Sequence, residues 1–219
     1  HKPVLISLAR AGTPFGVLIK RTLNNCFHID ASHYSISIIR DKGIDYNAMN
    51  HILSIHGADA TFLFVDGWTG KGAIANQLHK SMRSLSQKLN YQFIVLSDIA
   101  GVADVAARRE DYIIPSCLLN STISGLISRT LINANPTSFH RAKFYFQYQN
   151  KDLSLQYVNK IEQYIIDHAI DFQNVEVQYF NQAAKDIYVR FVESMLGKYK
   201  ISNRNYKINI FFVLIYYKY

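Results

Sequence analysis

The chain has 219 residues, of which 49% are hydrophobic, and its formal net charge is +8. This length can bury a core and exceeds one small domain, so an α/β domain with an appendage is the first expectation. The positive charge favours anionic partners such as phosphorylated small molecules or RNA. The longest apolar run near the end, residues 208–217, is too short to span a bilayer, and no membrane association is expected.

The cysteine content predicts a reducing compartment. Cys26 and Cys117 lie far apart and form no CxxC pair, so neither a disulfide framework nor a zinc site is expected. Residues 1–9 lead directly into an expected core strand, which predicts no signal peptide and a cytoplasmic location. The first residue is His1 rather than Met, and a truncated N-terminus is one interpretation.

The visible chain begins with a strand–loop–helix unit. Residues 3–8 are typical of a buried strand, and a helical pattern runs from Phe15 to about Leu23. Thr13 is the expected N-cap, with Pro14 in the first helical position. The intervening residues 10–12 place an arginine and free N–H groups at a helix N-terminus, which suits an anion. A surface arginine beside a tight turn is the alternative.

A second unit follows. Residues 33–40 are β-rich, residues 41–43 break the pattern, and residues 44–56 have helical spacing that Gly57 ends. An unbroken apolar run at residues 61–65 then predicts a strand buried on both faces.

A loop rich in Gly and Thr joins this strand to a helix that starts at Ala73. Its residues are Asp66, Gly67, Trp68, Thr69, Gly70, Lys71 and Gly72. Strand, glycine-rich loop and helix N-terminus form a phosphate-cradling arrangement. The loop is not a Walker A motif, because the position five before Gly70 is Val65 rather than Gly. An ordinary tight turn is the alternative, in which Trp68 covers the loop instead of stacking on a base.

The remaining pattern predicts a helix from Ala73 to about Leu89, a strand at 91–96, a helix at about 99–108 and a short strand at 112–114. Strands that alternate with helices predict a parallel sheet covered on its faces. Ligands bind beyond the carboxyl ends of such strands. This rule puts the following residues along one rim: Arg10, Arg40–Lys42, Asp66–Gly72 and Asp98.

The pattern changes after Pro136. A helix from about 152 to 168, a strand at 175–180 and a helix at about 182–197 are expected. The predicted organisation is an α/β domain over 1–135, an α+β extension over 136–198 and a tail of uncertain structure over 199–219.

Four motifs carry a resemblance to a known family. Residues 10–12 after one strand, and Val65-Asp66 with Thr69-Gly70 after another, resemble the type I phosphoribosyltransferase fold. More closely, residues 5–14, 33–40, 64–74 and 115–125 are similar to the StiP family. This phosphoribosyltransferase-like group accompanies tellurite-resistance and stress gene clusters in bacteria. The resemblance covers roughly residues 3–170 and implies a mostly parallel twisted sheet flanked by helices, with a C-terminal α+β extension.

The resemblance implies a PRPP-dependent transfer of ribose 5-phosphate to an unknown acceptor base, in nucleotide or nucleoside biosynthesis. In this reading residues 10–12 bind pyrophosphate, and residues 69–72 hold the 5-phosphate. Asp66 bonds the ribose hydroxyls and reaches Mg²⁺ indirectly, through ribose and water. Arg40 and Lys42 lie on a mobile loop. The implied catalytic residues are Asp66, Arg10 and Lys42, and the implied substrate-binding residues are Ala11, Gly12, Arg40, Gly67, Trp68, Thr69, Gly70, Lys71, Gly72, Asn120, Ser121 and Thr122.

Three alternatives stay open. Gly67 follows Asp66 where the fold ordinarily has a second acid, which leaves a nucleotide-binding protein with altered catalysis. Some relatives are labelled as cysteine proteases, and Cys117 is then the candidate nucleophile, although no local cysteine signature supports it. The charge also permits RNA binding, which in the family involves a neighbouring Pelota-like domain absent here. A homodimer is left open.

Overall fold

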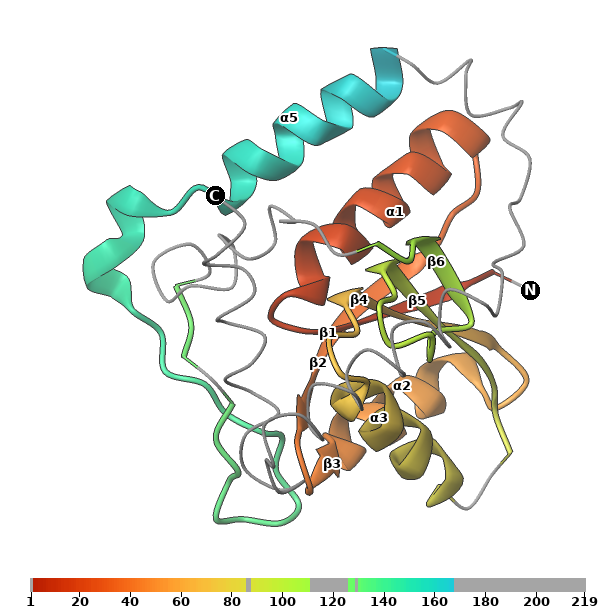
Figure 1. Cartoon of the computed structure of the whole chain (residues 1–219). Coiled ribbons are helices and arrows are strands. Elements are labelled where there is room, and N and C mark those ends of the chain that lie inside the picture. The colour runs from red at the N-terminus through yellow and green to blue at the C-terminus, as the bar shows by residue number, and fades with distance from the viewer. Residues whose placement is uncertain (1, 86–87, 111–125, 129, 168–219) are drawn as a thin grey trace, which may run out of the picture. The chain divides into compact units, whose positions relative to one another are not determined.

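The computed structural model describes residues 2–85, 88–110, 126–128 and 130–167, all within one compact unit, His1–Gln178. The fold is α/β, with a mostly parallel sheet in the order β3-β2-β1-β4-β5-β6 (Figure 1). Only β3 runs antiparallel to its neighbour within this sheet. The strands are β1 Val4–Ala9, β2 Ser32–Ile39, β3 Gly43–Ile44, β4 Thr61–Trp68, β5 Asn90–Ser97 and β6 Val105–Arg108. The helices are α1 Gly12–Phe27, α2 Tyr46–His56, α3 Ala73–Arg83, the 3₁₀ helix η1 Phe146–Lys151 and α5 Ser154–Asp167.

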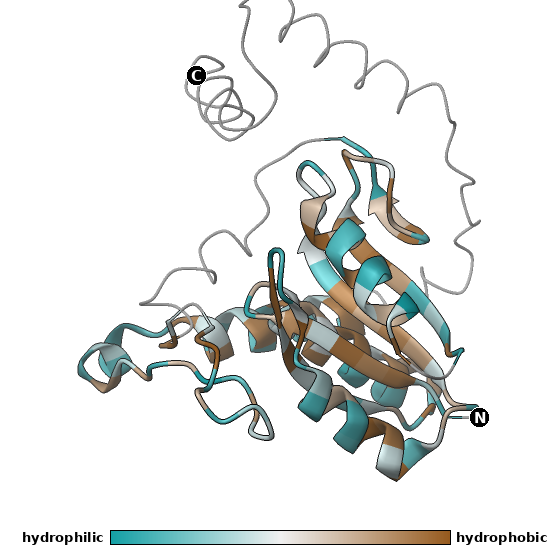
Figure 2. Ribbon diagram, turned by 90° about the horizontal axis from the view of Figure 1, so that it is seen from below, coloured by the Kyte–Doolittle hydropathy of each residue, from teal (hydrophilic) through white to brown (hydrophobic). Residues whose placement is uncertain are grey.

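The two faces of the sheet bury separate apolar clusters. Phe62, Phe64 and Phe93 are fully buried on the face that α2 and α3 cover, whereas Leu5 and Val65 pack against α1 on the other face. Figure 2 shows this pattern, since the strands carry the hydrophobic colour and the outer sides of the helices carry the hydrophilic one. Alternating side chains on strands buried from both sides explain the apolar runs in the sequence. Among the described residues no helix is long and apolar enough to cross a membrane.

Helix α1 begins differently from the prediction. It starts at Gly12, one residue earlier than the expected cap, and no side chain caps it. Thr13 lies inside the helix, where its hydroxyl hydrogen-bonds to that of Ser35 at 2.6 Å. The early start lets the first turn lie directly against β4: a Cβ atom on Gly12 would lie only 2.2 Å from the carbonyl oxygen of Val65. The first loop is therefore packed against the central strand.

Strand β4 is longer than predicted. It was expected to end at Val65 but continues to Trp68, because β5 pairs with it as far as Trp68 opposite Ser97. Asp66, Gly67 and Trp68 are thus strand residues, and the loop before α3 is only residues 69–72. Helix α3 also ends earlier than expected, at Arg83.

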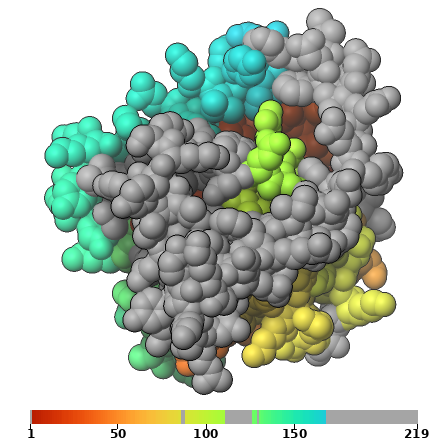
Figure 3. All heavy atoms as spheres, viewed as in Figure 1, coloured from red at the N-terminus to blue at the C-terminus, as the bar shows by residue number. Residues whose placement is uncertain are grey.

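The helix predicted at about 99–108 is wrong. A loop leads instead into the edge strand β6, which Figure 3 shows at the surface. The carboxylate of Asp98 accepts hydrogen bonds from the N–H groups of Val102 and Ala103, at 3.0 and 3.1 Å. Asp104 then accepts from the N–H of Phe93 at 2.7 Å. These side-chain bonds satisfy backbone donors outside a helix, which is how aspartate competes with helix formation.

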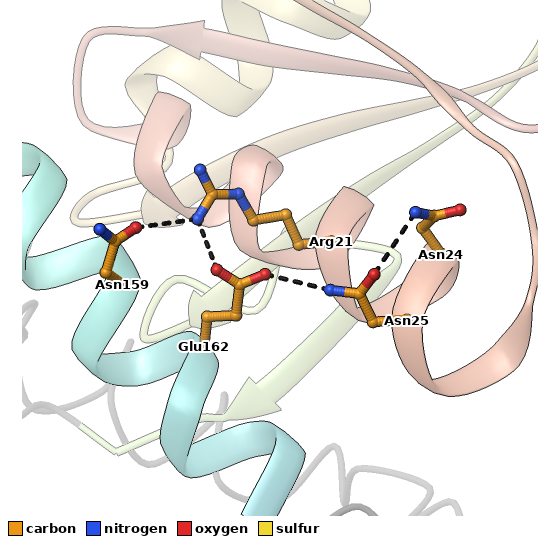
Figure 4. Close-up of polar contacts among 5 residues, drawn as sticks. All are labelled: Arg21, Asn24, Asn25, Asn159 and Glu162. Carbon is orange, nitrogen blue, oxygen red and sulfur yellow. Dashed lines mark hydrogen bonds and ion pairs between the residues drawn. The ribbon is translucent and has the colours of Figure 1, made fainter.

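Helix α5 packs on α1 through a polar cluster (Figure 4). The guanidinium of Arg21 donates to Glu162 at 2.5 Å and to Asn159 at 3.1 Å, and Asn25 donates to the second oxygen of Glu162 at 3.1 Å. The prediction of a helix at about 152–168 is confirmed, with its start at Ser154. The strands expected at 112–114 and 175–180 and the helix at 182–197 lie outside the described residues, and the predicted boundary near 136 stays a prediction.

Candidate functional site at the carboxyl ends of the strands

The order of the parallel strands singles out one place on the sheet. Without the antiparallel β3 the order is β2-β1-β4-β5-β6. The strand that follows β1 in the sequence lies on one side of the β1–β4 pair, and the strand that follows β4 lies on the other side. Helix α1 follows β1 on one face, and α3 follows β4 on the other (Figure 1). Open α/β sheets bind ligands at this topological switch point, beyond the carboxyl ends of the strands. We call the residues there the switch-point rim: Arg10–Gly12, Asp66–Gly72 and Ser97–Ala100.

The loops after β4 and β5 are bonded to one another. Thr69 donates its N–H to the carbonyl of Ser97 at 3.1 Å, and its hydroxyl accepts from the N–H of Ala100 at 3.2 Å. Gly72 donates to the carbonyl of Thr69 at 2.8 Å. Thr69 is buried. The hydroxyl that the sequence suggested for a phosphate is therefore already engaged by the protein, and the rim is built before any ligand arrives.

Trp68 covers the loop, as in the alternative interpretation of the sequence. A Cβ atom on Gly70 would lie 3.3 Å from the indole ring, and Gly70 has a φ of +54°. Gly72, the N-cap of α3, has a φ of +77°. Both angles lie in the left-handed region that glycine adopts freely, so this tight turn requires glycine at these positions.

The rim contains two aspartates, Asp66 and Asp98, and Asp66 is the one that belongs to a strand. It is partly buried, and within the described part of the chain its carboxyl accepts a hydrogen bond from the N–H of Gly67 at 2.7 Å. Burial raises the pKa of this carboxyl from its ordinary value of 3.8 to about 7, and the Gly67 bond opposes the rise. Perturbed carboxyl groups in a binding crevice are candidates for a functional role.

Arg10 joins the rim to a distant part of the chain. Its guanidinium donates to the carbonyl of Ile127 at 2.7 Å. Ile127 pairs with Phe144, and Leu131 pairs with Arg141, which makes residues 126–128 and 130–145 a two-stranded segment that we call the strap. Arg10 therefore fixes the strap beside the carboxyl end of β1.

A second group of polar residues ties the strap to β2 and α2. The Nδ1 atom of His140 hydrogen-bonds to the hydroxyl of Ser37, and the backbone N–H of His140 donates to Asp45 at 2.7 Å. The other oxygen of Asp45 accepts from the N–H of Ala48 at 3.0 Å and caps α2. Asn47 donates to the carbonyls of two strap residues, Pro136 and Ser138. We call Ser37, Asp45 and His140 the histidine cluster.

Another Ser–His pair lies in the interior. The hydroxyl of Ser7 is 2.8 Å from Nε2 of His33, and Ser7 is completely buried. A Cβ atom on Gly16 of α1 would lie 2.0 Å from the Ser7 oxygen, so the helix lies directly on this pair, and the ring of His33 is partly exposed. Burial, and then the charge of Lys20, lowers the pKa of His33. This pair is a packing feature of the core.

Several predicted residues lie away from the rim or turn their side chains away from it. Arg40 and Lys42 are exposed in the tight turn between β2 and β3, where the N–H of Asp41 donates to Gln77 at 3.0 Å, rather than on a long loop. Asp98 turns its carboxylate to its own loop. Cys117 and the residues expected to contact the acceptor base, Asn120, Ser121 and Thr122, lie outside the described residues.

No metal centre is evident in the described part of the chain, where no three His, Cys, Asp or Glu residues are grouped to hold an ion. The indirect Mg²⁺ contact of Asp66 stays a prediction. The histidine cluster was not identified from the sequence, since its bonds join residues 95 and 103 positions apart. Only the capping role of Asp45, three residues before Ala48, leaves a local signal.

Comparison with known proteins points to one family. A family model described as "Tellurite-like stress resistance cysteine protease StiP" matches residues 1–162. A protein named "Cysteine protease StiP", from Acinetobacter baylyi, is 38% identical over 215 residues, which is 92% of this chain and 56% of the relative. The chain thus spans a little over half the length of that relative.

Both descriptions correct the main functional expectation. They name a cysteine protease, so the prediction of a PRPP-dependent phosphoribosyltransferase was wrong, and the reading kept as its alternative is the one supported. The association with tellurite and stress resistance agrees with the resemblance seen in the sequence. With a model match over 162 residues and a relative at 38% identity, the chain belongs to the StiP family.

Proposed function

We propose that this chain is a cysteine peptidase in which Cys117 is the nucleophile and His140 is its general base. The observation that carries the assignment is the histidine cluster. Among the described histidines, His140 is held at the carboxyl ends of the strands by both its ring and its backbone. The names of the family and of the relative support the reaction class.

Cys117 is preferred to the other cysteine of the chain, Cys26. Cys26 lies in the last turn of α1, close to where β2 begins and therefore at the opposite edge of the sheet. A helix carboxyl end carries partial negative charge, whereas catalytic thiolates are stabilised by cations or helix amino ends.

The described residues on either side of Cys117 support the choice. Glu110 accepts a hydrogen bond from the hydroxyl of Ser97 at 2.7 Å, at the carboxyl end of β5. Leu126 accepts from the N–H of Tyr145 within the strap at 2.7 Å. The chain therefore leaves and rejoins the described structure on the side of the sheet where His140 lies.

The cluster suits His140 to its role. When Nδ1 donates to the Ser37 hydroxyl, the lone pair of the ring is on Nε2, which then accepts the thiol proton. The thiolate forms a bond to the peptide carbonyl carbon. The C–N bond breaks as His140 returns the proton to the leaving amine, and water hydrolyses the resulting thioester. Asp45 holds the backbone of His140 and is a positioning residue.

The test is cleavage of a fluorogenic peptide library by the purified chain and by three variants. Cys117→Ala should abolish cleavage, and His140→Gln should reduce kcat by about 100-fold or more, the range for loss of a general base. Cys26→Ala is the matched control and should cleave normally. Cleavage that survives Cys117→Ala, or that disappears with Cys26→Ala, would overturn the assignment.

A second readout does not require a substrate. Alkylation by iodoacetamide, followed by mass spectrometry, should modify Cys117 faster than Cys26, because the thiolate is the reactive form. His140→Gln should slow modification of Cys117 and leave that of Cys26 unchanged. Equal rates at the two cysteines would contradict an activated nucleophile.

A further inference from the structure

The carboxyl of Asp66 lies above an apolar floor. Alternation along β4 places it on the same face as Phe62 and Phe64, both fully buried. Asp66 is opposite Val95 on β5, and the pairing of Ser7 with Val65 brings Leu8 of β1 to its other side. Val95 and Leu8 are also buried. The carboxyl is therefore the polar end of an apolar column at the switch point.

This carboxyl has no cationic partner among the described residues. The described ion pairs involve other acids, and the shift of its pKa arises from burial and the Gly67 bond, with no contribution from a described cation. The neighbouring acid Asp98 is bonded to two backbone N–H groups. A partly buried carboxylate without a counter-charge is costly, and a cation that binds beside it recovers part of that cost.

We propose that Asp66 forms a subsite at the switch-point rim for the guanidinium or ammonium group of a bound peptide. The substrate class is then peptides with an arginine or lysine near the cleaved bond, which rests on the proposed peptidase function. Ser37 of the histidine cluster lies on β2, two strands away from Asp66. It pairs with Ala9 of the intervening β1, whereas Asp66 is level with Leu8, so the two side chains leave opposite faces of the sheet and a peptide that contacts both must cross its carboxyl edge. Two strand spacings are about 10 Å, so at least about three residues of extended peptide separate the two groups.

Three other charged residues belong to the rim around the subsite. Arg10, after β1, donates to the Ile127 carbonyl. Lys71, before α3, is exposed, and Asp98, after β5, is turned into its loop. Because Asp66 titrates near neutral pH, a cation should bind more tightly at pH 8 than at pH 6, where the carboxyl is largely protonated.

The probes are N-acetyl-arginine amide and N-acetyl-citrulline amide, which have nearly the same shape and differ in charge. Calorimetric titration should show that the arginine amide binds at least about 10-fold more tightly at pH 8, as expected for a hydrogen bond between charged groups. The preference should shrink at pH 6. Asp66→Asn should remove it, and Asp59→Asn, at an exposed site near the start of β4, should retain it.

Asp66→Ser is the second variant, and thermal unfolding checks that all three variants are folded. Equal binding of the two amides to the wild-type chain, or an arginine preference that survives in Asp66→Asn and Asp66→Ser, would overturn the subsite.

A parallel assay separates this inference from the peptidase itself. Peptides that carry arginine or citrulline at each of the three positions before the cleaved bond are offered to the same proteins. Cleavage without an arginine preference would reject the subsite and leave the peptidase intact. Selective binding of the arginine amide without cleavage of any peptide would reject the peptidase and leave the subsite intact.

Discussion

The ionisation of Asp66 has a consequence for stability that is independent of any substrate. Its carboxyl has an ordinary pKa of 3.8 in the unfolded chain and about 7 in the folded protein. Between these values the folded protein binds more protons than the unfolded chain, so the free energy of unfolding falls as pH rises. The contribution is complete below about pH 4 and is lost as pH passes through about 7.

We therefore compare the free energy of unfolding of Asp66→Asn with that of wild type at two pH values. The difference should favour the variant more at pH 8 than at pH 4.5, because the amide carries no buried charge. Urea unfolding midpoints at the two pH values measure the difference. Asp59→Asn, at an exposed position, should follow the wild-type curve. Parallel curves for wild type and Asp66→Asn would show that Asp66 ionises as freely in the folded protein as in the unfolded chain.

Single residues also show how far the sequence could be read. The loop after β1 and the glycine-rich turn after β4 were predicted, because Gly, Pro and Thr leave local signals at strand ends. The sequence could not show that Asp66 is in a strand, since its pairing with Val95 depends on a partner 29 residues away. His140 was one histidine among eight until the fold brought Ser37 to its ring.

At the scale of elements, the polar contact between α1 and α5 is the clearest long-range junction. The carboxylate of Glu162 accepts hydrogen bonds from Arg21 and Asn25, which lie 141 and 137 residues earlier in the sequence. The side chains of Arg21 and Glu162 are 34% and 22% exposed, so water screens the pair only partly. The sequence predicted a helix at about 152–168, but nothing local in it could identify the helix against which α5 packs.

We expect Glu162→Gln to lower the free energy needed to detach α5 from α1 by about 1 kcal/mol, the upper range for a partly exposed ion pair. Hydrogen exchange of the α5 amides should become correspondingly faster, while amides of β4 and β5 keep their rates. Asp167→Asn is the control, because Asp167 accepts a bond from Gln163 within the same helix. If Glu162→Gln and Asp167→Asn have the same effect, the cluster in Figure 4 does not hold α5 in place.

At the scale of the whole described unit, alternation of strands and helices predicted a mostly parallel sheet, and the structure confirms it. The error at residues 99–108 came from an Ala- and Val-rich segment whose local pattern permits a helix, whereas side chains of Asp98 and Asp104 hold it as a loop and edge strand. The strap is the larger omission. It has little periodicity of its own, and its position depends on Arg10, Asp45 and Asn47, all more than eighty residues earlier.

Asp45 connects three parts of the unit at once. Its N–H donates to the carbonyl of Ser37 on β2, one carboxylate oxygen caps α2, and the other holds the backbone of His140 in the strap. The residue is buried, and bonds between a carboxylate and backbone N–H groups are stronger than neutral ones. A variant that retains the cap and removes the strap bond would separate the two roles.

Asp45→Ser is that variant, because serine caps helices well but has a single side-chain oxygen. We expect α2 amides to keep their protection from hydrogen exchange. The paired strap amides of Leu131 and Arg141 should exchange faster, by the factor of about 10 that corresponds to 1–2 kcal/mol. In Asp45→Ala the amides of both α2 and the strap should exchange faster, because this variant also removes the helix cap at a cost of about 1 kcal/mol. If the strap is equally protected in wild type and Asp45→Ser, the strap is held by its bonds to Arg10, Ser37 and Asn47. In that case Asp45→Ser should also cleave peptides as fast as wild type. If instead the strap depends on Asp45, the variant should have a lower kcat and an unchanged KM. The reason is that His140 moves away from the thiol while the Asp66 subsite is unaltered.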